Sequence, residues 1–214
     1  PSSGELRIGC PEITMAGLLP AIVERVFQQY PRIRLHVVLA QTAMHQFQEL
    51  RERNIDLLIG RVSRELSAED LTSDLLFDDP FLTVAGTNSK LARRRHVALE
   101  ELMSEAWVLP PYNSVPGSLI LQMFRVSKLQ PPRPSITTLS GQLTATLIAS
   151  GRFVGVLPAS VAHFHRRAGL KILPLKLPAL HLAASIVTVK DRTLSPSAKL
   201  FIDCAREVAR SFAA

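Results

Sequence analysis

The stretch "RNIDLLIGRVS", residues Arg53 to Ser63, decides the fold that we expect. Its central run, Ile55 to Ile59, is almost entirely apolar, and a glycine and then an arginine follow it. Short apolar runs bounded in this way are typical of a strand buried on both faces, as in a parallel sheet. The carboxyl end of such a strand lies at a crevice. Arg61 is therefore expected to face either solvent or a ligand.

Strand and helix patterns alternate upstream of this run. Because proline is tolerated only in the first turn of a helix, Pro20 predicts that the first long helix begins close to Gly17. A strand at 5–9 precedes this helix, and a strand at 34–40 and a helix at 45–53 follow it. The order β-α-β-α-β indicates a parallel sheet with right-handed crossovers.

The second half repeats the alternation. Expected strands lie at 81–86, 107–110, 135–139, 153–158, 170–175 and 182–190, and expected helices at 98–103, 119–129, 141–151, 160–168 and 196–212. These patterns predict a bilobal α/β protein whose chain crosses between lobes more than once, with subdomain I at 1–79 plus 184–214 and subdomain II at 80–183. A ligand is then expected in the cleft between the lobes.

Composition excludes several classes of protein. The 214 residues are 47% hydrophobic, which suffices for a large core, yet no run of about 18 apolar residues lacks charge, so no membrane span is expected. The amino end lacks the basic and apolar regions of a signal peptide, although a removed signal would leave no trace. Cys10 and Cys204 are too few for a disulfide framework, and we interpret them as reduced, buried thiols of a cytoplasmic protein.

The net charge of +7 favours anionic partners, either nucleic acid or small anions. The basic residues are dispersed along the sequence, with one short run at Lys90 to Arg95 and no interleaved aromatic residues. This run is interpreted as a solvated loop, with a nucleic-acid contact as the alternative.

Four segments, in order, resemble the effector-binding region of LysR-type transcriptional regulators. They are "GELRIGCPEITMAGLLPAIVERVFQQYPRIRLHVVLAQT" (4–42), "LRERNIDLLIG" (50–60), "LIASGRFVGVLPAS" (147–160) and "RTLSPSAKLFIDCARE" (192–207). The chain departs from the family pattern at Asn54 and Phe153, where glycine is usual, and at "TNSKLARRR" (87–95), where a His-Pro-Leu turn is frequent.

The resemblance implies a type II periplasmic-binding-protein-like fold with two α/β subdomains joined by two crossover segments. It also implies a ligand sensor that forms a homodimer, and a homotetramer in the full-length protein. Such regulators bind DNA through an amino-terminal helix-turn-helix, which is absent from this sequence, so the chain is expected to bind DNA only without sequence preference. No membrane partner, metal or cofactor is expected.

Candidate ligand contacts follow the predicted strands. In the first lobe, Thr14 is either a helix cap or a donor to a carboxylate, and Thr42 lies at the equivalent end of the next strand. In the second lobe, the segment 113–118 is either a simple turn or a ligand contact, and Ser140 is a helix N-cap, a ligand contact or both. The predicted effector-binding residues are Ile13, Thr14, Thr42, Arg61, Asn113, Ser114, Pro116, Gly117, Ser118 and Ser140.

Arg61 is predicted to anchor the carboxylate of an anionic effector. We expect Arg61→Ala to weaken effector binding about ten- to a hundredfold. The melting temperature of the unliganded protein should remain nearly unchanged by this substitution.

Three functions are compatible with this fold. The leading hypothesis is the effector sensor of a LysR-type regulator, which alters transcription on binding a small metabolite. The alternative is a free-standing solute-binding protein of a transporter, and the third is an enzyme. An enzyme is disfavoured because no G-x-S-x-G turn is present and because His163 and His165, at i and i+2, point to different faces of a helix rather than to one metal.

Overall fold

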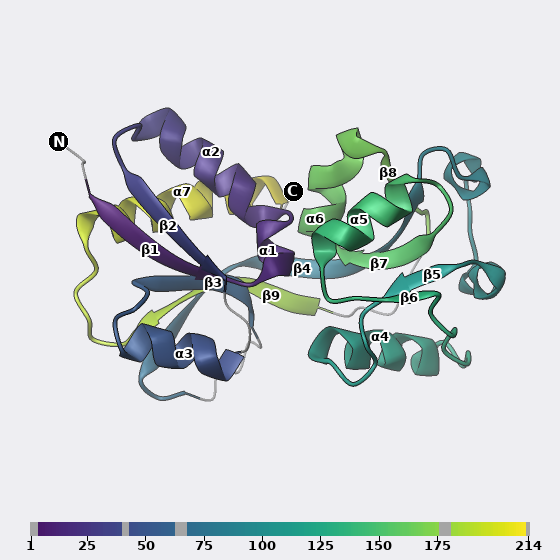
Figure 1. Cartoon of the computed structure of the whole chain (residues 1–214), viewed down its shortest axis with the longest axis horizontal. Helices are drawn as coiled ribbons and strands as arrows, with labels where there is room; N and C mark the ends of the chain where they lie inside the picture. The colour runs from purple at the N-terminus through teal and green to yellow at the C-terminus, as the bar shows by residue number, and fades with distance from the viewer. Residues whose placement is uncertain (1–3, 40–42, 63–67, 176–180, 213–214) are drawn as a thin grey trace. The chain divides into compact units, whose positions relative to one another are not determined.

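The computed structural model describes residues 4–39, 43–62, 68–175 and 181–212 (Figure 1). The chain divides into two compact units. Unit 1 comprises Pro1–Asp79 and Leu182–Ala214, and unit 2 comprises Pro80–His181. The first boundary coincides with the one expected from the sequence, and the second lies two residues before it. Strands β4 (Leu71–Gly86) and β9 (His181–Val189) run through these boundaries.

Unit 1 contains a mixed sheet with the strand order β2-β1-β3-β9. Strand β1 (Glu5–Cys10) pairs in parallel with β2 (Arg34–Leu39) and with β3 (Leu57–Val62), while β3 and β9 are antiparallel. The predicted parallel β-α-β-α-β unit is therefore confirmed. The antiparallel β9 returns the chain from unit 2 to this sheet.

Strand β3 is buried on both faces, as its sequence predicts. Leu57 and Ile59 join the core formed with the helices α2 (Leu18–Gln29) and α7 (Pro196–Phe212), whereas Leu58 packs with Leu50 of helix α3 (Ala43–Arg51). Figure 1 shows α2 and α7 on one side of the sheet and α3 on the other. All three strand side chains have no exposed surface. Their burial explains why Leu57, Leu58 and Ile59 are all apolar.

Helix α2 begins where the sequence predicts. Gly17 is its N-cap residue, and Pro20 lies in the first turn, where its missing N–H has no intrahelical partner to lose. The sequence did not predict the short helix α1 (Glu12–Met15) that precedes it. Because α1 fills the connection from β1 to α2, Ile13 and Thr14 lie within a helix rather than in an open loop.

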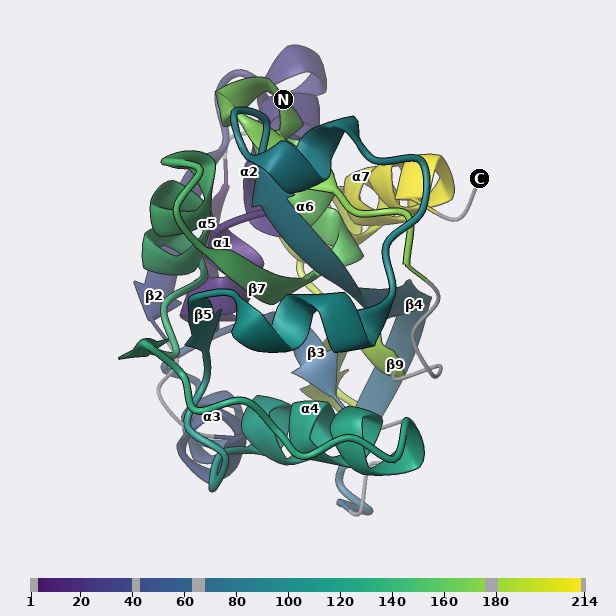
Figure 2. The same ribbon diagram turned by 90° about the vertical axis from the view of Figure 1, so that its right-hand side faces the viewer.

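Unit 2 contains a sheet with the strand order β4-β7-β5-β6, and β8 pairs with β4. The remaining strands are β5 (Trp107–Leu109), β6 (Ile136–Thr137), β7 (Val154–Pro158) and β8 (Leu170–Ile172). The helices are α4 (Val115–Val126), α5 (Gly141–Ala149) and α6 (Ala159–Phe164), and the 3-10 turns are η1 (Lys90–Arg93), η2 (Leu99–Ser104) and η3 (His165–Ala168). Figure 2 shows α4 on one side of the sheet and α5 and α6 on the other.

Three elements of the structure differ from the sequence prediction. Strand β4 begins at Leu71, ten residues before the expected strand. The segment expected as a helix at 98–103 is the 3-10 turn η2, and helix α4 begins at Val115 rather than at 119. Helix α4 starts early because the Ser114 side chain and Pro116 suit a helix amino terminus.

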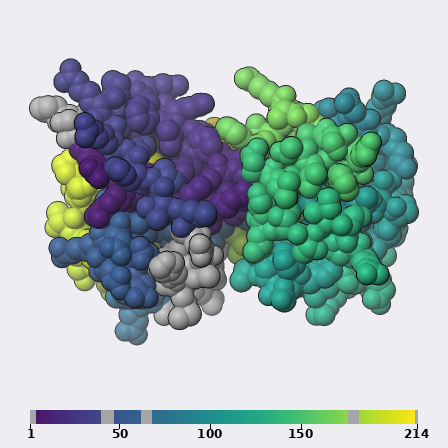
Figure 3. All heavy atoms as spheres, in the orientation of Figure 1, coloured from purple at the N-terminus to yellow at the C-terminus, as the bar shows by residue number. Residues whose placement is uncertain are grey.

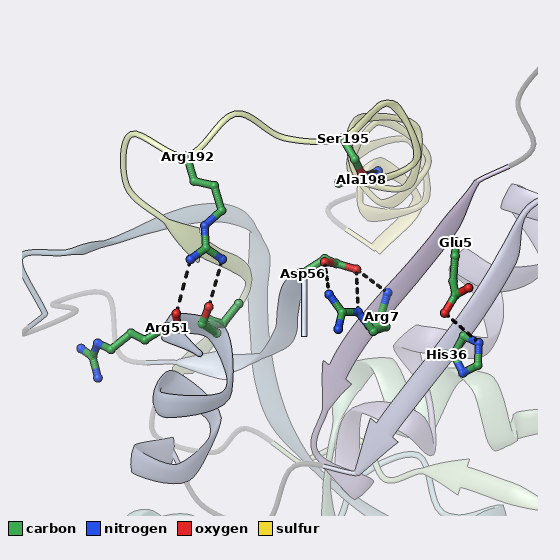
Figure 4. A network of polar contacts seen from close by, with 9 residues as sticks. Glu5, Arg7, His36, Arg51, Asp56, Arg192, Ser195 and Ala198 are labelled. Carbon is green, nitrogen blue, oxygen red and sulfur yellow. Dashed lines mark hydrogen bonds and ion pairs between the residues drawn. The ribbon is translucent and has the colours of Figure 1, made fainter. Parts of the chain in front are cut away.

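Polar contacts connect strands and helices of unit 1 (Figure 4). Arg7 on β1 forms an ion pair of 2.9 Å with Asp56, whose carboxylate also accepts a hydrogen bond from the backbone N–H of Arg7. Arg192 donates to the carbonyl oxygen of Leu50 at 3.0 Å, which satisfies a carbonyl at the carboxyl end of α3. These contacts hold β1, β3 and α3 in place around the apolar run of β3.

Strand β2 forms an edge of the unit 1 sheet and exposes apolar side chains. Val37, Val38 and Leu39 are 42%, 40% and 54% exposed. Figure 3 shows atoms in the colour of residues 34–39 at the surface of this face. An uncovered edge strand with apolar side chains is a pairing surface for another chain. No helix in the described part of the chain is long and apolar enough to cross a bilayer.

Candidate functional site

Thr14 lies directly after β1, in the second half of the short helix α1. The residue is 2% exposed, and its hydroxyl oxygen has no hydrogen-bond partner among the described residues. Pro11 and Gly17 occupy the N-cap positions of α1 and α2, so Thr14 caps neither helix. The helix-cap interpretation of Thr14 is therefore wrong. A buried hydroxyl without a partner costs about 1–3 kcal/mol, which a ligand that pairs with it recovers.

The end of β3 lies beside the connection that carries Ile13 and Thr14. Strands β1 and β3 are parallel neighbours, so their carboxyl ends share one edge of the sheet. A Cβ atom on Gly60 would lie 3.2 Å from the ring of Pro11, which shows how closely the two segments approach. The structure thus brings Ile13, Thr14 and Arg61 to the same edge of unit 1. Thr42 lies outside the described residues.

Arg61 does not face solvent, which was one of the two orientations expected from its sequence position. Its guanidinium lies 3.4 Å (Nε) from the carboxylate of Asp79 and donates a hydrogen bond of 2.7 Å (Nη2) to the Asp79 carbonyl oxygen. The two side chains are only 7% and 1% exposed. Burial lowers the pKa of Arg61 to about 10, while the charge of Asp79 acts in the opposite direction. Arg61 is therefore a charged, buried residue with a structural partner.

Asp79 is a polar core residue that the sequence prediction missed. It is the last residue of unit 1 on β4, eighteen positions after Arg61. Its position within "FDDP" resembles an ordinary acidic turn, and the sequence did not predict a strand there. The buried pair thus links β3 to the point where β4 leaves unit 1.

The segment 113–118 in unit 2 forms a turn that satisfies its own polar groups. The Ser114 hydroxyl donates to the Pro111 carbonyl oxygen at 2.6 Å and accepts from the Gly117 N–H at 3.2 Å. The Ser118 hydroxyl donates to the Val115 carbonyl oxygen at 2.8 Å. Ser114 is thus the N-cap of α4. The exposed Asn113 and the half-buried Pro116 flank Ser114, and a ligand contact of this turn stays a prediction.

Ser140 is the N-cap of α5, as the sequence predicts, and its hydroxyl accepts from the Leu143 N–H at 3.1 Å. Strands β5 and β6 are parallel neighbours, and the turns that follow them lead to α4 and α5 respectively. The Ser114 and Ser140 turns therefore lie at one edge of the unit 2 sheet. Each unit by itself gathers its predicted contacts at the carboxyl ends of its parallel strands.

Both cysteines are free thiols and are buried. Burial raises the pKa of the Cys10 thiol well above its ordinary value, which leaves the thiol protonated at neutral pH and weakly nucleophilic. The described residues contain no group of three or more His, Cys, Asp or Glu side chains placed to hold a metal ion.

Comparison with known proteins places the chain in a family. The family model described as LysR substrate binding domain matches residues 1–210. The transcriptional dual regulator GltC of Bacillus subtilis is 28% identical over 209 residues, which cover 95% of this chain and 67% of GltC. The chain spans 67% of the length of GltC and 52% of the length of CysL of the same organism.

Solved structures show the same fold. The effector-binding domain of QuiR in complex with shikimate has a TM-score of 0.69 and 19% identity, with 98% of this chain and 99% of that chain covered. The BenM effector-binding domain with benzoate has a TM-score of 0.68 and 23% identity, with 98% and 91% covered. The fold is thus the type II periplasmic-binding-protein-like fold of these domains. A regulator is favoured over a transporter binding protein. The chain belongs to the LysR substrate-binding domain family, the effector-sensing region of LysR-type transcriptional regulators.

Proposed function

We propose that this chain senses a small carboxylate and passes the signal to a DNA-binding part of a cytoplasmic transcriptional regulator. The buried hydroxyl of Thr14 carries the proposal, because it is a donor that finds no acceptor among the described residues. QuiR and BenM bind shikimate and benzoate, and both ligands are carboxylates. We take the chain to be a sensor without catalytic activity.

The proposal assigns Ile13 and Thr14 to the ligand contacts of unit 1 and the turns at Ser114 and Ser140 to those of unit 2. The hydroxyls of Ser118 and of the half-buried Ser114 already donate hydrogen bonds to backbone carbonyl oxygens, so they can donate to a ligand only if these bonds break. We therefore propose that these two residues orient the ligand and contribute little to its affinity. Arg61 contributes positive potential at the edge beside Thr14, although its guanidinium is held by Asp79. A ligand that binds one conformation better than another shifts the population toward it, and this shift is the signal.

Thr14→Val should weaken carboxylate binding about ten- to a hundredfold, because it removes a hydrogen bond to a charged group worth roughly 1.5–3 kcal/mol. The unliganded protein should be as stable as the wild type or slightly more stable, since the hydroxyl has no partner to lose. A panel of small carboxylates that includes shikimate and benzoate is titrated by calorimetry to find a ligand, and the two proteins are then compared with it.

Thr83→Val is the matched control. Thr83 is 2% exposed and its hydroxyl also lacks a partner among the described residues, but it lies in the middle of β4 and is no predicted contact. We expect Thr83→Val to leave the affinity unchanged. Equal affinities of wild type and Thr14→Val would contradict the site, and failure of every carboxylate to bind at about millimolar concentration would contradict the ligand class.

The proposed sensor forms a two-fold homodimer, and a homotetramer in the full-length protein. The exposed Val37, Val38 and Leu39 on the edge strand β2 support self-association, as do Phe27 on α2 and Val126 on α4, which are 42% and 60% exposed. An isologous interface uses the same patch on both copies. Sedimentation equilibrium should therefore detect dimers at tens of micromolar, roughly the range for a weak interface of standard size.

A charge on the exposed strand tests this assembly. Val38→Lys should shift the sedimentation equilibrium toward monomer, because a lysine on each edge strand opposes pairing. Thr146→Lys, an exposed change on α5 in unit 2 away from the proposed interface, is the control for added charge alone. If sedimentation equilibrium detected only monomer for the wild type at this concentration, the result would contradict the proposed dimer.

A further inference from the structure

The positive charge of the chain is concentrated in unit 2. Residues 80–181 hold 12 of the 25 Lys and Arg residues but only 3 of the 18 Asp and Glu residues. Unit 2 therefore has a formal charge of +9. Unit 1 has a formal charge of −2, which brings the total for the chain to +7. Unit 2 holds nearly half of the basic residues but few acidic ones, so most of its cations have no acidic residue of the same unit to offset them.

Three segments that carry these cations meet at one end of the unit 2 sheet. The turn after β4 is joined to the turn before β8 by a hydrogen bond of 2.8 Å from the Thr87 N–H to the Gly169 carbonyl oxygen. A Cβ on Gly151, which follows α5, would lie 3.6 Å from the Ser89 nitrogen, so the α5–β7 turn also contacts the first segment. Figure 2 looks onto this side of unit 2. Segments 87–95, 150–152 and 165–171 thus form one continuous surface.

This surface, here called the basic surface, carries eight exposed cations. Their side chains belong to Lys90, Arg93, Arg94, Arg95, Arg152, Arg166, Arg167 and Lys171. Among the described residues, two of these eight cations form an ion pair within 4.0 Å: Arg94 with Glu101, and Lys90 with Glu105. The other six therefore project their charge into solvent without a close carboxylate in the described part of the chain.

We propose that the basic surface binds the phosphate backbone of duplex DNA without reading its sequence. This inference rests on the proposed function, since the sensor region of a regulator works beside DNA. Six of the eight cations are arginines, whose planar fork matches phosphate oxygens in two hydrogen bonds. Cations spread over several turns fit the repeating charges of a backbone better than a single small anion.

The chemistry of the surface favours a duplex over a single strand. Proteins that bind single strands stack successive bases on several aromatic side chains. The exposed aromatic residue beside the basic surface is Phe164, and the His165 ring already lies edge-on to it at 5.3 Å. No long helix projects from these three segments to enter a groove, since η1 and η3 have four residues each.

The test compares two variants of this chain that lose the same number of charges. The first replaces Arg93, Arg95, Arg166 and Arg167 by glutamine, and the matched control replaces the exposed Arg32, Arg34, Lys199 and Arg210 of unit 1. Binding to a fluorescent duplex of about 20 base pairs and arbitrary sequence is followed by anisotropy at several salt concentrations from about 50 mM upward, where backbone contacts are strongest.

We expect the first variant to bind at least about tenfold more weakly than the wild type at low salt, and the control to lose at most about twofold. The slope of log affinity against log salt should become shallower by about 0.9 for each phosphate contact removed. Equal losses in both variants would overturn the proposal, because they would show an effect of net charge alone. Tighter binding to the single strand, or binding of polyglutamate but not of the duplex, would overturn it as well.

These outcomes are separate from the test of the proposed function. The DNA titration needs no effector, and the carboxylate titration of Thr14→Val needs no DNA. If the duplex fails to bind while Thr14→Val weakens carboxylate binding, the basic surface is refuted and the sensor stands. If no carboxylate binds while the basic variant loses its affinity for the duplex, the sensor proposal fails alone.

Discussion

Arg61→Met and Asp79→Leu are each expected to lower the free energy of unfolding by about 3–5 kcal/mol. Each change removes one member of a buried ion pair whose side chains are 7% and 1% exposed. An unpaired charge in such a place must be neutralised or drawn toward water, and both responses disturb the packing around it. Urea unfolding followed by circular dichroism measures the loss.

The double variant Arg61→Met/Asp79→Leu should recover most of this loss. Replacement of a buried ion pair by apolar residues of similar volume is often close to neutral, because the desolvation of both charges disappears together with their attraction. Part of the loss should remain, since the Asp79 carbonyl oxygen loses the hydrogen bond that Arg61 donates at 2.7 Å. Additive losses in the double variant would contradict a direct interaction between the two side chains.

This expected result replaces the one drawn from the sequence. There, Arg61→Ala was expected to leave the melting temperature of the unliganded protein nearly unchanged. The contact with Asp79 now predicts a marked fall, because the substitution breaks a buried ion pair. A melting temperature equal to that of the wild type would show that the Asp79 charge finds another partner or water.

Gly117→Ala is expected to lower the free energy of unfolding by about 3 kcal/mol, at the upper end for an overpacked site. A Cβ atom at this position would overlap the carbonyl oxygen of Pro111, and the next nearest atoms also belong to backbone. The clash cannot be relieved by a side-chain rotation. The turn must open, and the N-cap contact of Ser114 with the Gly117 N–H is then lost. Thermal unfolding and urea unfolding both measure this effect.

Ser118→Ala is the control for Gly117→Ala. Ser118 is exposed, and its hydroxyl bonds only to the carbonyl oxygen one turn earlier, so its removal should change stability by about 0.5 kcal/mol or less. Similar losses for the two variants would show that helix α4 is generally sensitive to substitution. A Gly117→Ala protein as stable as the wild type would contradict the close approach of Pro111.

The sequence correctly predicted the elements whose own residues indicate the same structure that packing in the folded protein requires. The apolar run of β3, the helix start at Gly17 and the helix α7 each follow from residues within one segment. The first half of β4 was missed because Leu71 to Asp79 mixes exposed polar residues with a few buried ones. Asp79 reads as a turn residue until Arg61, eighteen positions away, is known to lie against it.

The candidate site was predictable in its place but not in its details. Parallel strands bring their carboxyl ends to one edge, so Thr14 and Arg61 were expected there from connectivity alone. Their hydrogen-bond states depend on α1 and on Asp79, which no pattern near either residue indicates. The basic surface was missed for a similar reason, because its three segments are far apart in the chain and meet only in the folded unit.

The split of unit 1 across the sequence sets the order in which a nascent chain can fold. Residues 1–79 leave the ribosome before unit 2, but the core of unit 1 also needs Ala184, Ile186 and Phe201 from β9 and α7. Unit 2 is contiguous and can complete its own sheet while unit 1 waits. At about 5–20 residues per second, this wait lasts roughly 5–20 s. During that time the apolar faces of α2 and β3 lack their cover, so residues 1–79 are exposed to aggregation or chaperone binding until β9 and α7 are made.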